Sequence, residues 1–161
     1  MDTIETKTAL KVVFGAMVVG KRGTYPPISS SPIFTLSTGS NAFIGRVHNL
    51  TDCAAMLDVL QKHGHDEIDT ARAYGGGSSE ECLGQLKWQD RGIVIGTKLS
   101  PHRFGPLKPG QRAYSHKKDD LKPGLLESLE ALQSDKVDLW YLHAPDVSTS
   151  PILFYFILRF F

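Results

Sequence analysis

Apolar and amphipathic stretches alternate along this 161-residue chain, and that alternation constrains the fold more than any other feature. Four apolar runs have the pattern of buried strands, at residues 9–20, 67–71, 92–97 and 136–143. Three segments with helical periodicity separate them, beginning near Thr51 or Asp52, at Ser78, and near Asp119 or Asp120. Because parallel strands need long crossover connections, this order predicts an α/β fold with a parallel sheet. Right-handed crossovers then build either a doubly wound sheet or a barrel.

Local signals predict where the helices begin and which residues face inward. Thr51 or Asp52 caps the first helix, and Ser78 with Glu81 has the spacing of a capping box for the second. We expect Pro123 in the first turn of the third helix, where its missing N–H has no partner to lose. The inward residues are expected to be Cys53, Met56, Leu57 and Leu60, then Cys82, Leu83 and Leu86, and finally Leu121, Leu125, Leu129 and Leu132.

Charge and cysteine content exclude several classes of protein. The 18 Lys and Arg against 17 Asp and Glu give a net charge of +1, so electrostatics offers no reason to expect nucleic acid as a partner. The acidic start at residues 1–5 lacks the apolar core of a secretory signal, and no segment suits a membrane span, so we expect a cytoplasmic protein. Cys53 and Cys82 are too few for a disulfide scaffold and are expected to be inert core residues.

Ionisable residues stand where three consecutive strands end. Asp69 follows the second strand, Lys98 the third and His143 the fourth, and Tyr74 lies in the loop just beyond Asp69. Parallel α/β proteins place reactive groups at this edge, and a buried charge there is costly unless it is paired or used. An ammonium group beside a phenol favours the phenolate, and an imidazole stabilises charge developing on a carbonyl oxygen. The set therefore suits protonation of a carbonyl oxygen while a hydride reaches its carbon.

The same residues lie in three motifs that resemble the aldo-keto reductase family. The motifs are Asp69-Thr70-Ala71-Arg72-Ala73-Tyr74-Gly75, Gly96-Thr97-Lys98 and Asp138-Leu139-Trp140-Tyr141-Leu142-His143. The sequence around Tyr74-Gly75-Gly76-Gly77 and His143-Ala144-Pro145-Asp146 looks most like the aflatoxin-aldehyde reductase branch. The resemblance covers residues 11–20 and 46–149.

The resemblance implies a (β/α)8 barrel that uses NADPH to reduce aldehydes and ketones to alcohols. It implies that Tyr74 is the proton donor, that Lys98 and Asp69 tune it, and that His143 orients the carbonyl group. Tyr74 and His143 would then contact the substrate. Ala16, Met17 and Asp69 match positions that approach the nicotinamide ribose of the cofactor.

Two segments depart from the family pattern. Residues 23–45 form an uncharged insert rich in Ser, Thr, Pro and Gly, and residues 151–161 form an apolar tail. A full barrel needs about 250 residues, so we interpret the chain as a single truncated domain holding about half a barrel. We interpret both segments as gene-model artefacts. The alternative function is an inactive half-barrel fragment that lacks the second half of the cofactor site and self-associates through open sheet edges. A third possibility is a different barrel enzyme that does not use nicotinamide.

Two further motifs have an ordinary structural explanation. Gly75-Gly76-Gly77 lacks the spacing of a phosphate-binding loop, so we interpret it as a turn that frees Tyr74 to reach the site. His63, His65 and Asp66 lie close together, but no second ligand cluster accompanies them, and we expect no metal site.

Overall fold

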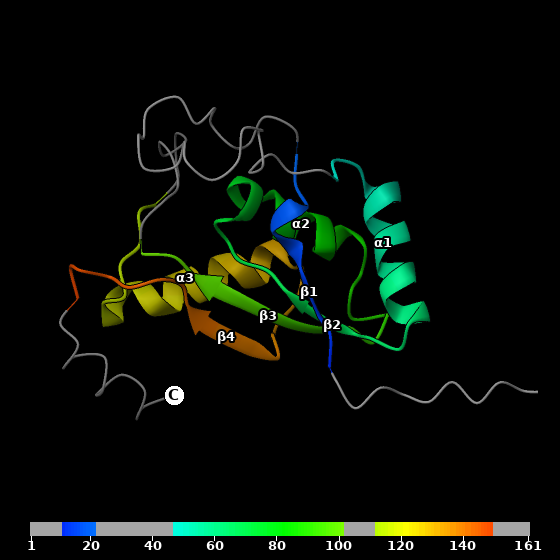
Figure 1. Cartoon of the computed structure of the whole chain (residues 1–161). Coiled ribbons are helices and arrows are strands. Elements are labelled where there is room, and N and C mark those ends of the chain that lie inside the picture. Colours follow the sequence, from blue (N-terminus) through cyan, green and yellow to red (C-terminus); the bar gives the residue numbers. More distant parts are fainter. Residues whose placement is uncertain (1–10, 22–46, 102–111, 150–161) are drawn as a thin grey trace, which may run out of the picture.

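The computed structural model describes residues 11–21, 47–101 and 112–149, in which four parallel strands form one sheet. The strands are β1 (Val13–Gly15), β2 (Glu67–Asp69), β3 (Val94–Leu99) and β4 (Leu139–Leu142). The helices are α1 (Leu50–Lys62), α2 (Ser78–Gln85) and α3 (Lys118–Ala131), with 3-10 turns η1 (Ala16–Val18) and η2 (Tyr74–Gly77). Each strand neighbours the next one in sequence, an order typical of a barrel, whereas a doubly wound sheet reverses its strand order. The predicted parallel α/β fold is confirmed (Figure 1). The insert at 23–45 and the tail at 151–161 lie outside the described residues.

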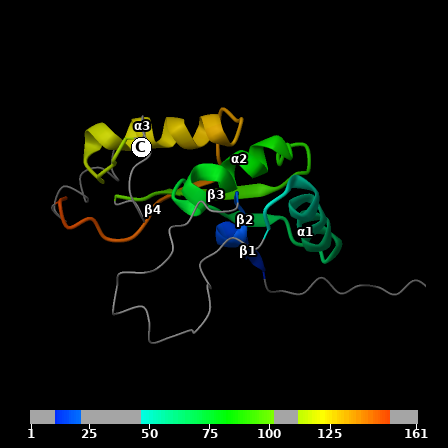
Figure 2. The same cartoon turned by 90° about the horizontal axis from the view of Figure 1, so that it is seen from above.

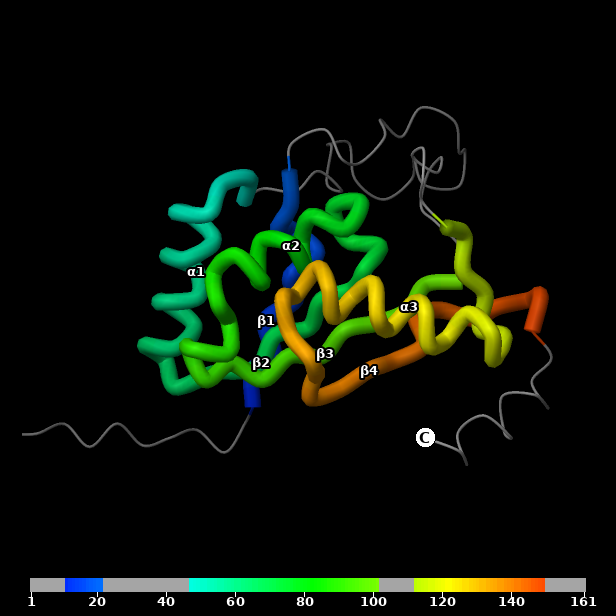
Figure 3. Tube along the Cα trace, turned by 180° about the vertical axis from the view of Figure 1, so that it is seen from behind, coloured from blue at the N-terminus to red at the C-terminus, as the bar shows by residue number. Residues whose placement is uncertain are grey.

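The helices cover one face of the sheet. Phe14, Ile68 and Ile95 are partners in register across β1, β2 and β3, and they meet Leu57 of α1 and Leu83 of α2 in the core. In Figure 1, α2 and α3 lie behind the strands and α1 stands beside β1 and β2, and in Figure 3, which views the opposite side, α2 and α3 lie in front. Seen from above in Figure 2, α2 and α3 run along the same side of the sheet. The inward faces predicted for α1 and α2 are confirmed, with Cys53, Leu57 and Leu83 fully buried.

The opposite face of the sheet is open within the described part of the chain. Val13, Leu139 and Tyr141 are 45–49% exposed there, although β-strand residues of this size usually pack against a second layer. In the described ranges, β1 and β4 form the two edges of the sheet. This open apolar face is the inner face of a barrel that these four strands would close only in part.

Three helix signals were misassigned by the sequence patterns. The cap of α1 is Asn49, whose side-chain oxygen accepts a hydrogen bond from Asp52 N at 2.7 Å, in place of Thr51 or Asp52. The cap of α2 is Gly77 in a left-handed conformation, and the Ser78 hydroxyl donates instead to Gly75 O at 2.6 Å. Pro123 is the sixth residue of α3, inside the helix and beyond its first turn.

Within the described ranges, none of the helices combines the length and apolarity that crossing a bilayer requires.

A charged network is buried between α2, α3 and the sheet. Glu80 has no exposed surface, and its carboxylate accepts a hydrogen bond from Thr97 Oγ1 at 2.6 Å and one from Arg72 at 3.3 Å. The Arg72 guanidinium also binds Glu127 at 3.1 Å and donates to Gly77 O at 2.9 Å. Burial raises the pKa of Glu80 to about 7, although the hydrogen bond from Thr97 and the charge of Arg72 oppose this rise.

The raised pKa of Glu80 predicts a specific dependence of stability on pH. Between about pH 4.5 and pH 7 the unfolded chain releases the Glu80 proton while the folded chain keeps it, so this group makes folding less favourable as the pH rises. The free energy of unfolding of the wild type, minus that of Glu80→Gln, is expected to fall across this window by up to about 1 kcal/mol per pH unit. Urea titrations followed by circular dichroism measure both values.

The matched control is Glu130→Gln, which neutralises an exposed carboxylate on α3. The difference in free energy of unfolding between the wild type and Glu130→Gln is expected to show no comparable change with pH. A flat or rising difference for Glu80→Gln would contradict the assignment of a proton to buried Glu80 near neutral pH.

Candidate active site

The structure brings the four predicted catalytic residues together at the carboxyl edge of the sheet. Asp69 is the last residue of β2, Lys98 is the next-to-last residue of β3, and His143 directly follows β4. Tyr74 opens η2, the turn that follows β2. Because the three strands are parallel and in register, their carboxyl ends meet at one edge, which is where barrel enzymes carry their chemistry.

The Lys98 ammonium is held by two acceptors. Its Nζ donates to Asp69 Oδ2 at 2.6 Å and to the backbone oxygen of Thr70 at 2.7 Å. Lys98 is opposite Tyr141 in the ladder, and its side chain leaves the sheet on the face away from the helices. The Lys98 side chain is only 15% exposed, so this ion pair is better shielded from water than a surface pair. The lysine head group is therefore fixed next to β2.

Tyr74 lies between Lys98 and His143. Lys98 Nζ is 5.1 Å from the centroid of the Tyr74 ring, within the range of a cation–π contact. The rings of Tyr74 and His143 meet edge to face, with centroids 5.6 Å apart and planes at 89°. A phenol, an ammonium group and an imidazole thus form one contiguous cluster.

Three glycines shape the turn that presents Tyr74. Gly75, Gly76 and Gly77 all have positive φ angles, 57°, 60° and 98°, a run that only glycine adopts easily. A Cβ on Gly75 would lie 2.6 Å from Ser78 Oγ, and one on Gly77 would lie 2.6 Å from the Arg72 guanidinium. The triple glycine is therefore a tight turn packed against its neighbours, as the sequence predicted.

Burial and neighbouring charges set the pKa of His143. Burial lowers the pKa of His143 below its ordinary value, the charges of Lys98 and His116 lower it further, and Asp69 opposes this shift. The backbone N–H of His143 donates to Leu99 O at 2.8 Å, which ties the residue to the end of β3. A neutral imidazole therefore stands beside Tyr74 at neutral pH.

The three residues predicted to bind a cofactor differ in their exposure. Ala16 is fully buried, and its carbonyl oxygen accepts hydrogen bonds from Ser79 Oγ and from Val19 N, both at 3.0 Å. Met17 is 41% exposed, and the Asp69 side chain is 35% exposed. Of the three side chains, only those of Met17 and Asp69 are accessible to a bound molecule. Cofactor binding by any of them stays a prediction.

Two polar positions that support this edge were not singled out from the sequence. Arg72, in the motif of Tyr74, anchors the glycine turn through Gly77 O. Asp146 accepts from the backbone N–H of His116 at 2.7 Å and from Ser148 Oγ at 2.7 Å, which joins the segment after β4 to the start of α3. Burial alone would raise the pKa of Asp146, but these hydrogen bonds hold it well below its usual range. The available signal for Asp146 was its spacing to Ser148 and Thr149, which is typical of a side chain that binds its own backbone.

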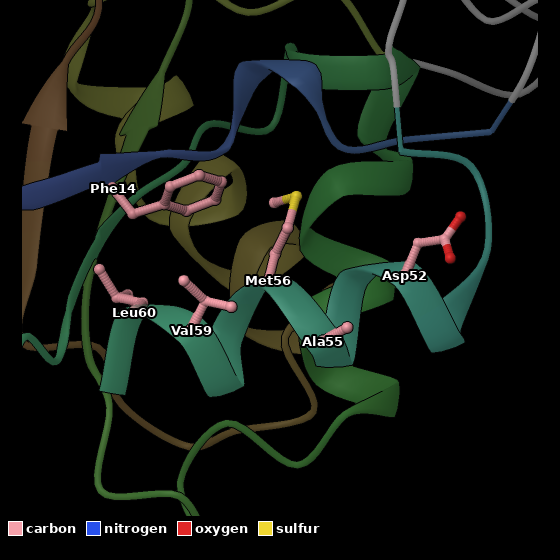
Figure 4. A pocket seen from close by; sticks show the side chains of 6 residues that line it. All are labelled: Phe14, Asp52, Ala55, Met56, Val59 and Leu60. Carbon is pink, nitrogen blue, oxygen red and sulfur yellow. The ribbon is translucent and has the colours of Figure 1, made fainter. Parts of the chain in front are cut away.

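A separate hollow of about 450 Å³ lies between β1 and α1 (Figure 4). Its lining is mostly apolar and consists of Phe14, Asp52, Ala55, Met56, Val59 and Leu60. It belongs to the helix side of the sheet and not to the edge that carries Tyr74. In the described part of the chain, no three His, Cys, Asp or Glu side chains come together as metal ligands.

Comparisons with known proteins agree with the fold. The model of the Aldo/keto reductase family matches residues 35–159. The chain is 63% identical over 94 residues to an aldo-keto reductase of Pseudocercospora fijiensis, which covers 58% of this chain and 30% of that protein. It is 35% identical over 125 residues to aflatoxin B1 aldehyde reductase member 2 of Mus musculus, covering 75% of this chain and 32% of that protein. A solved aldo-keto reductase from Bacillus halodurans superimposes with a TM-score of 0.59 at 23% identity over 88% of this chain and 38% of its own.

The fold is part of a (β/α)8 barrel whose strand ends carry ionisable residues. The chain belongs to the aldo/keto reductase family, and its homologues include aflatoxin B1 aldehyde reductases. It spans about a third of the length of the curated relatives it matches. The family match begins within the segment 23–45 and extends into the segment 151–161.

The cluster predicts that Lys98 controls the titration of His143. Lys98→Met removes a positive charge that lowers the pKa of His143 and leaves Asp69, which raises it, without its partner. The pKa of His143 is therefore expected to rise in this variant, as followed by imidazole resonances in two-dimensional NMR across a pH series. Lys62→Met, at the end of α1, is the control and is expected to leave the His143 titration where it is. An unchanged His143 titration in Lys98→Met would show that the two groups are not coupled.

Proposed function

We propose that this chain carries the catalytic residues of an NADPH-dependent reductase that converts aldehydes and ketones to alcohols. The supporting observation is the cluster at the carboxyl edge of the sheet, with Lys98 Nζ 5.1 Å from the Tyr74 ring and the His143 ring 5.6 Å from it. Aldehydes are the substrates named for several relatives, the aflatoxin B1 aldehyde reductases, which supports the same class of substrate here.

Tyr74 is the proton donor in this proposal. A phenol is a weak acid at neutral pH, so it needs a neighbour that stabilises the phenolate left behind. The Lys98 ammonium supplies that stabilisation from beside the ring. Asp69 keeps the ammonium in place through the 2.6 Å ion pair, so its role is to position Lys98. The proton therefore passes from the Tyr74 hydroxyl to the carbonyl oxygen as negative charge develops there.

His143 orients the substrate. Its lowered pKa keeps the ring neutral near pH 7, so the ring can donate one hydrogen bond to a carbonyl oxygen without bringing a full charge. The edge-to-face contact with Tyr74 brings this donor next to the phenol. A carbonyl oxygen between the two groups would receive a proton from one and a hydrogen bond from the other.

The residues present fit the reactive end of a nicotinamide cofactor. NADPH supplies a hydride to the carbonyl carbon when it is bound. Asp69 offers a partly exposed carboxylate that suits a ribose hydroxyl, and exposed Met17 offers an apolar contact on the neighbouring strand end. Ala16 supports Met17 from the core, because its side chain is buried and its carbonyl oxygen is already bonded.

The rival proposal is a catalytically inactive half-barrel. It is supported by the share of the relatives that this chain spans, about a third, and by the open face that exposes Val13, Leu139 and Tyr141. Such a protein would keep the residue cluster without a complete cofactor site, and it would associate through the edges β1 and β4.

Cofactor binding separates the two proposals. If the 161-residue chain binds NADPH, millimolar cofactor is expected to raise its melting temperature, because a ligand that binds only the folded state stabilises it. The measurement is differential scanning fluorimetry, with NADH and buffer alone as controls. No shift with either cofactor, together with mass that grows with protein concentration in light scattering, would favour the inactive half-barrel.

Turnover tests the proton donor. Tyr74→Phe is expected to lower kcat for reduction of an aromatic aldehyde by at least about 100-fold, because it removes the transferred proton. The loss of NADPH absorbance reports the rate, and the melting-temperature shift with NADPH is expected to remain. Tyr114→Phe is the matched control, since Tyr114 lies before α3 with its ring against Arg112, and not in the cluster of Tyr74, Lys98 and His143. Equal turnover by Tyr74→Phe and wild type would overturn the role of Tyr74.

A further inference from the structure

Exposed apolar side chains gather on the two edge strands of the sheet. In the described part of the chain, β1 and β4 lie at opposite edges (Figure 1). Val13 of β1, and Leu139 and Tyr141 of β4, leave the sheet on its open face and are 45–49% exposed. The outer backbone groups of an edge strand bind no neighbouring strand, so each edge is a site where another strand can pair.

The two edges are complementary to each other. All four strands run parallel, so β4 of one copy can bind β1 of a second copy without reversing the direction of the sheet. A (β/α)8 barrel has eight parallel strands, and the four described strands follow one another in barrel order. Two copies therefore supply the strands that close a barrel, and a closed barrel has no free edge. Because each chain carries a net charge of only +1, repulsion between two copies is small.

The register of the sheet determines how two copies would meet. One row of paired residues runs from Gly15, the last residue of β1, to Leu139, the first residue of β4. The rows thus drift toward the start of each later strand, and in a (β/α)8 barrel the drift amounts to about eight residues around the circumference. Half of the circumference accounts for about four residues, so the row that reaches Leu139 continues at the partner's Lys11. Two residues further along, Tyr141 lies opposite the partner's Val13.

The alternation of side chains agrees with this register. A shift by an even number of residues keeps the open faces of both copies on the same side. Val13 and Tyr141 both belong to that face, so their exposed side chains would become neighbours inside the barrel. Val12, which is 49% exposed on the other side of β1, would lie opposite the partner's Trp140. An odd shift would instead turn the open face of one copy toward the helix side of the other.

We propose that two copies of this chain pair through β1 and β4 and close an eight-stranded parallel barrel with two-fold symmetry. The β4 strand of each copy binds the β1 strand of the other, so the two interfaces are equivalent. Both open apolar faces then form the interior of one barrel. This closed pair differs from open-ended association through sheet edges, because it leaves no edge for a third copy.

The pairing would also complete the surroundings of the candidate active site. The carboxyl ends of all strands meet at one mouth of the barrel, so the Tyr74 clusters of both copies lie there. In the same register, His143 lies opposite the partner's Gly15, at the end of the partner's β1. The partner thus covers the side of the cluster that is at the sheet edge in a single chain. The pairing is independent of the carbonyl chemistry proposed for Tyr74.

The mass of the full chain in solution tests whether the pair closes. Sedimentation equilibrium at micromolar concentrations is expected to show twice the 17.8 kDa of one chain and no larger species. The mass of a single chain throughout, or a mass that keeps growing with concentration, would overturn the proposal.

A charge on the open face tests which surface pairs. Val13→Asp places a carboxylate in the interior beside the partner's Tyr141, and we expect it to raise the dissociation constant of the pair by at least about 100-fold. Leu126→Asp is the matched control, because Leu126 lies on α3 and is 53% exposed, and it is expected to leave the pair intact. Circular dichroism checks that both variants are folded. Equal association of Val13→Asp and wild type, or equal weakening by both variants, would overturn the assigned surface.

Cysteine cross-linking tests the register without depending on a destabilising charge. Within one chain, residues 13 and 141 lie on opposite edges of the sheet, three strand spacings or about 14 Å apart, which is too far for a disulfide. In the double variant Val13→Cys, Tyr141→Cys, oxidation with copper phenanthroline is therefore expected to link residues 12–21 of one copy to residues 137–159 of the other in a tryptic digest.

The matched control for cross-linking is Val12→Cys with Tyr141→Cys. Residue 12 is as exposed as residue 13 but faces the other side of the sheet, so no such link is expected. A link through residue 12 with none through residue 13, or no link in either variant, would overturn the proposed pairing.

Discussion

The parallel hydrogen-bonding register of β2, β3 and β4 is the constraint on which the site depends. It places Asp69 beside Gly96, two residues before Lys98, and the Lys98 side chain reaches Asp69 on the neighbouring strand. The Lys98 ammonium then satisfies both a carboxylate and a backbone carbonyl, so a charge at the edge of the sheet is paired instead of stranded. A slip of one residue would turn Lys98 into the helix layer and break the cluster.

Arg72 links the buried charged network to the turn that presents Tyr74. Its guanidinium joins the buried carboxylate of Glu80 to the backbone of the turn that presents Tyr74. Removing one partner of such a buried pair leaves an uncompensated charge, which is costly. The network therefore fixes the turn more firmly than three consecutive glycines could by themselves, because glycine gains the most freedom on unfolding.

The open face of the sheet bears on whether this chain is active. The four described strands present Lys98, Leu139 and Tyr141 on the face away from the helices, which in a complete barrel is the interior. The chain spans about a third of its curated relatives, so the activity of those longer proteins applies to it only as a proposal. The residue cluster needs only β2, β3, β4 and the turn after β2, and all of these are in place. The geometry of the residue cluster is therefore independent of the affinity of the chain for a cofactor.

The sequence by itself determined the order of strands and helices, the strand ends that carry Asp69, Lys98 and His143, and the glycine turn at Tyr74. These follow from periodicity and from local backbone preference, which a short window of residues contains. Only the tertiary structure decided that Glu80 is buried beside Arg72, and that Arg72 also reaches Glu127 of α3. Those features depend on which faces of separate elements meet. A short window of sequence does not contain that information.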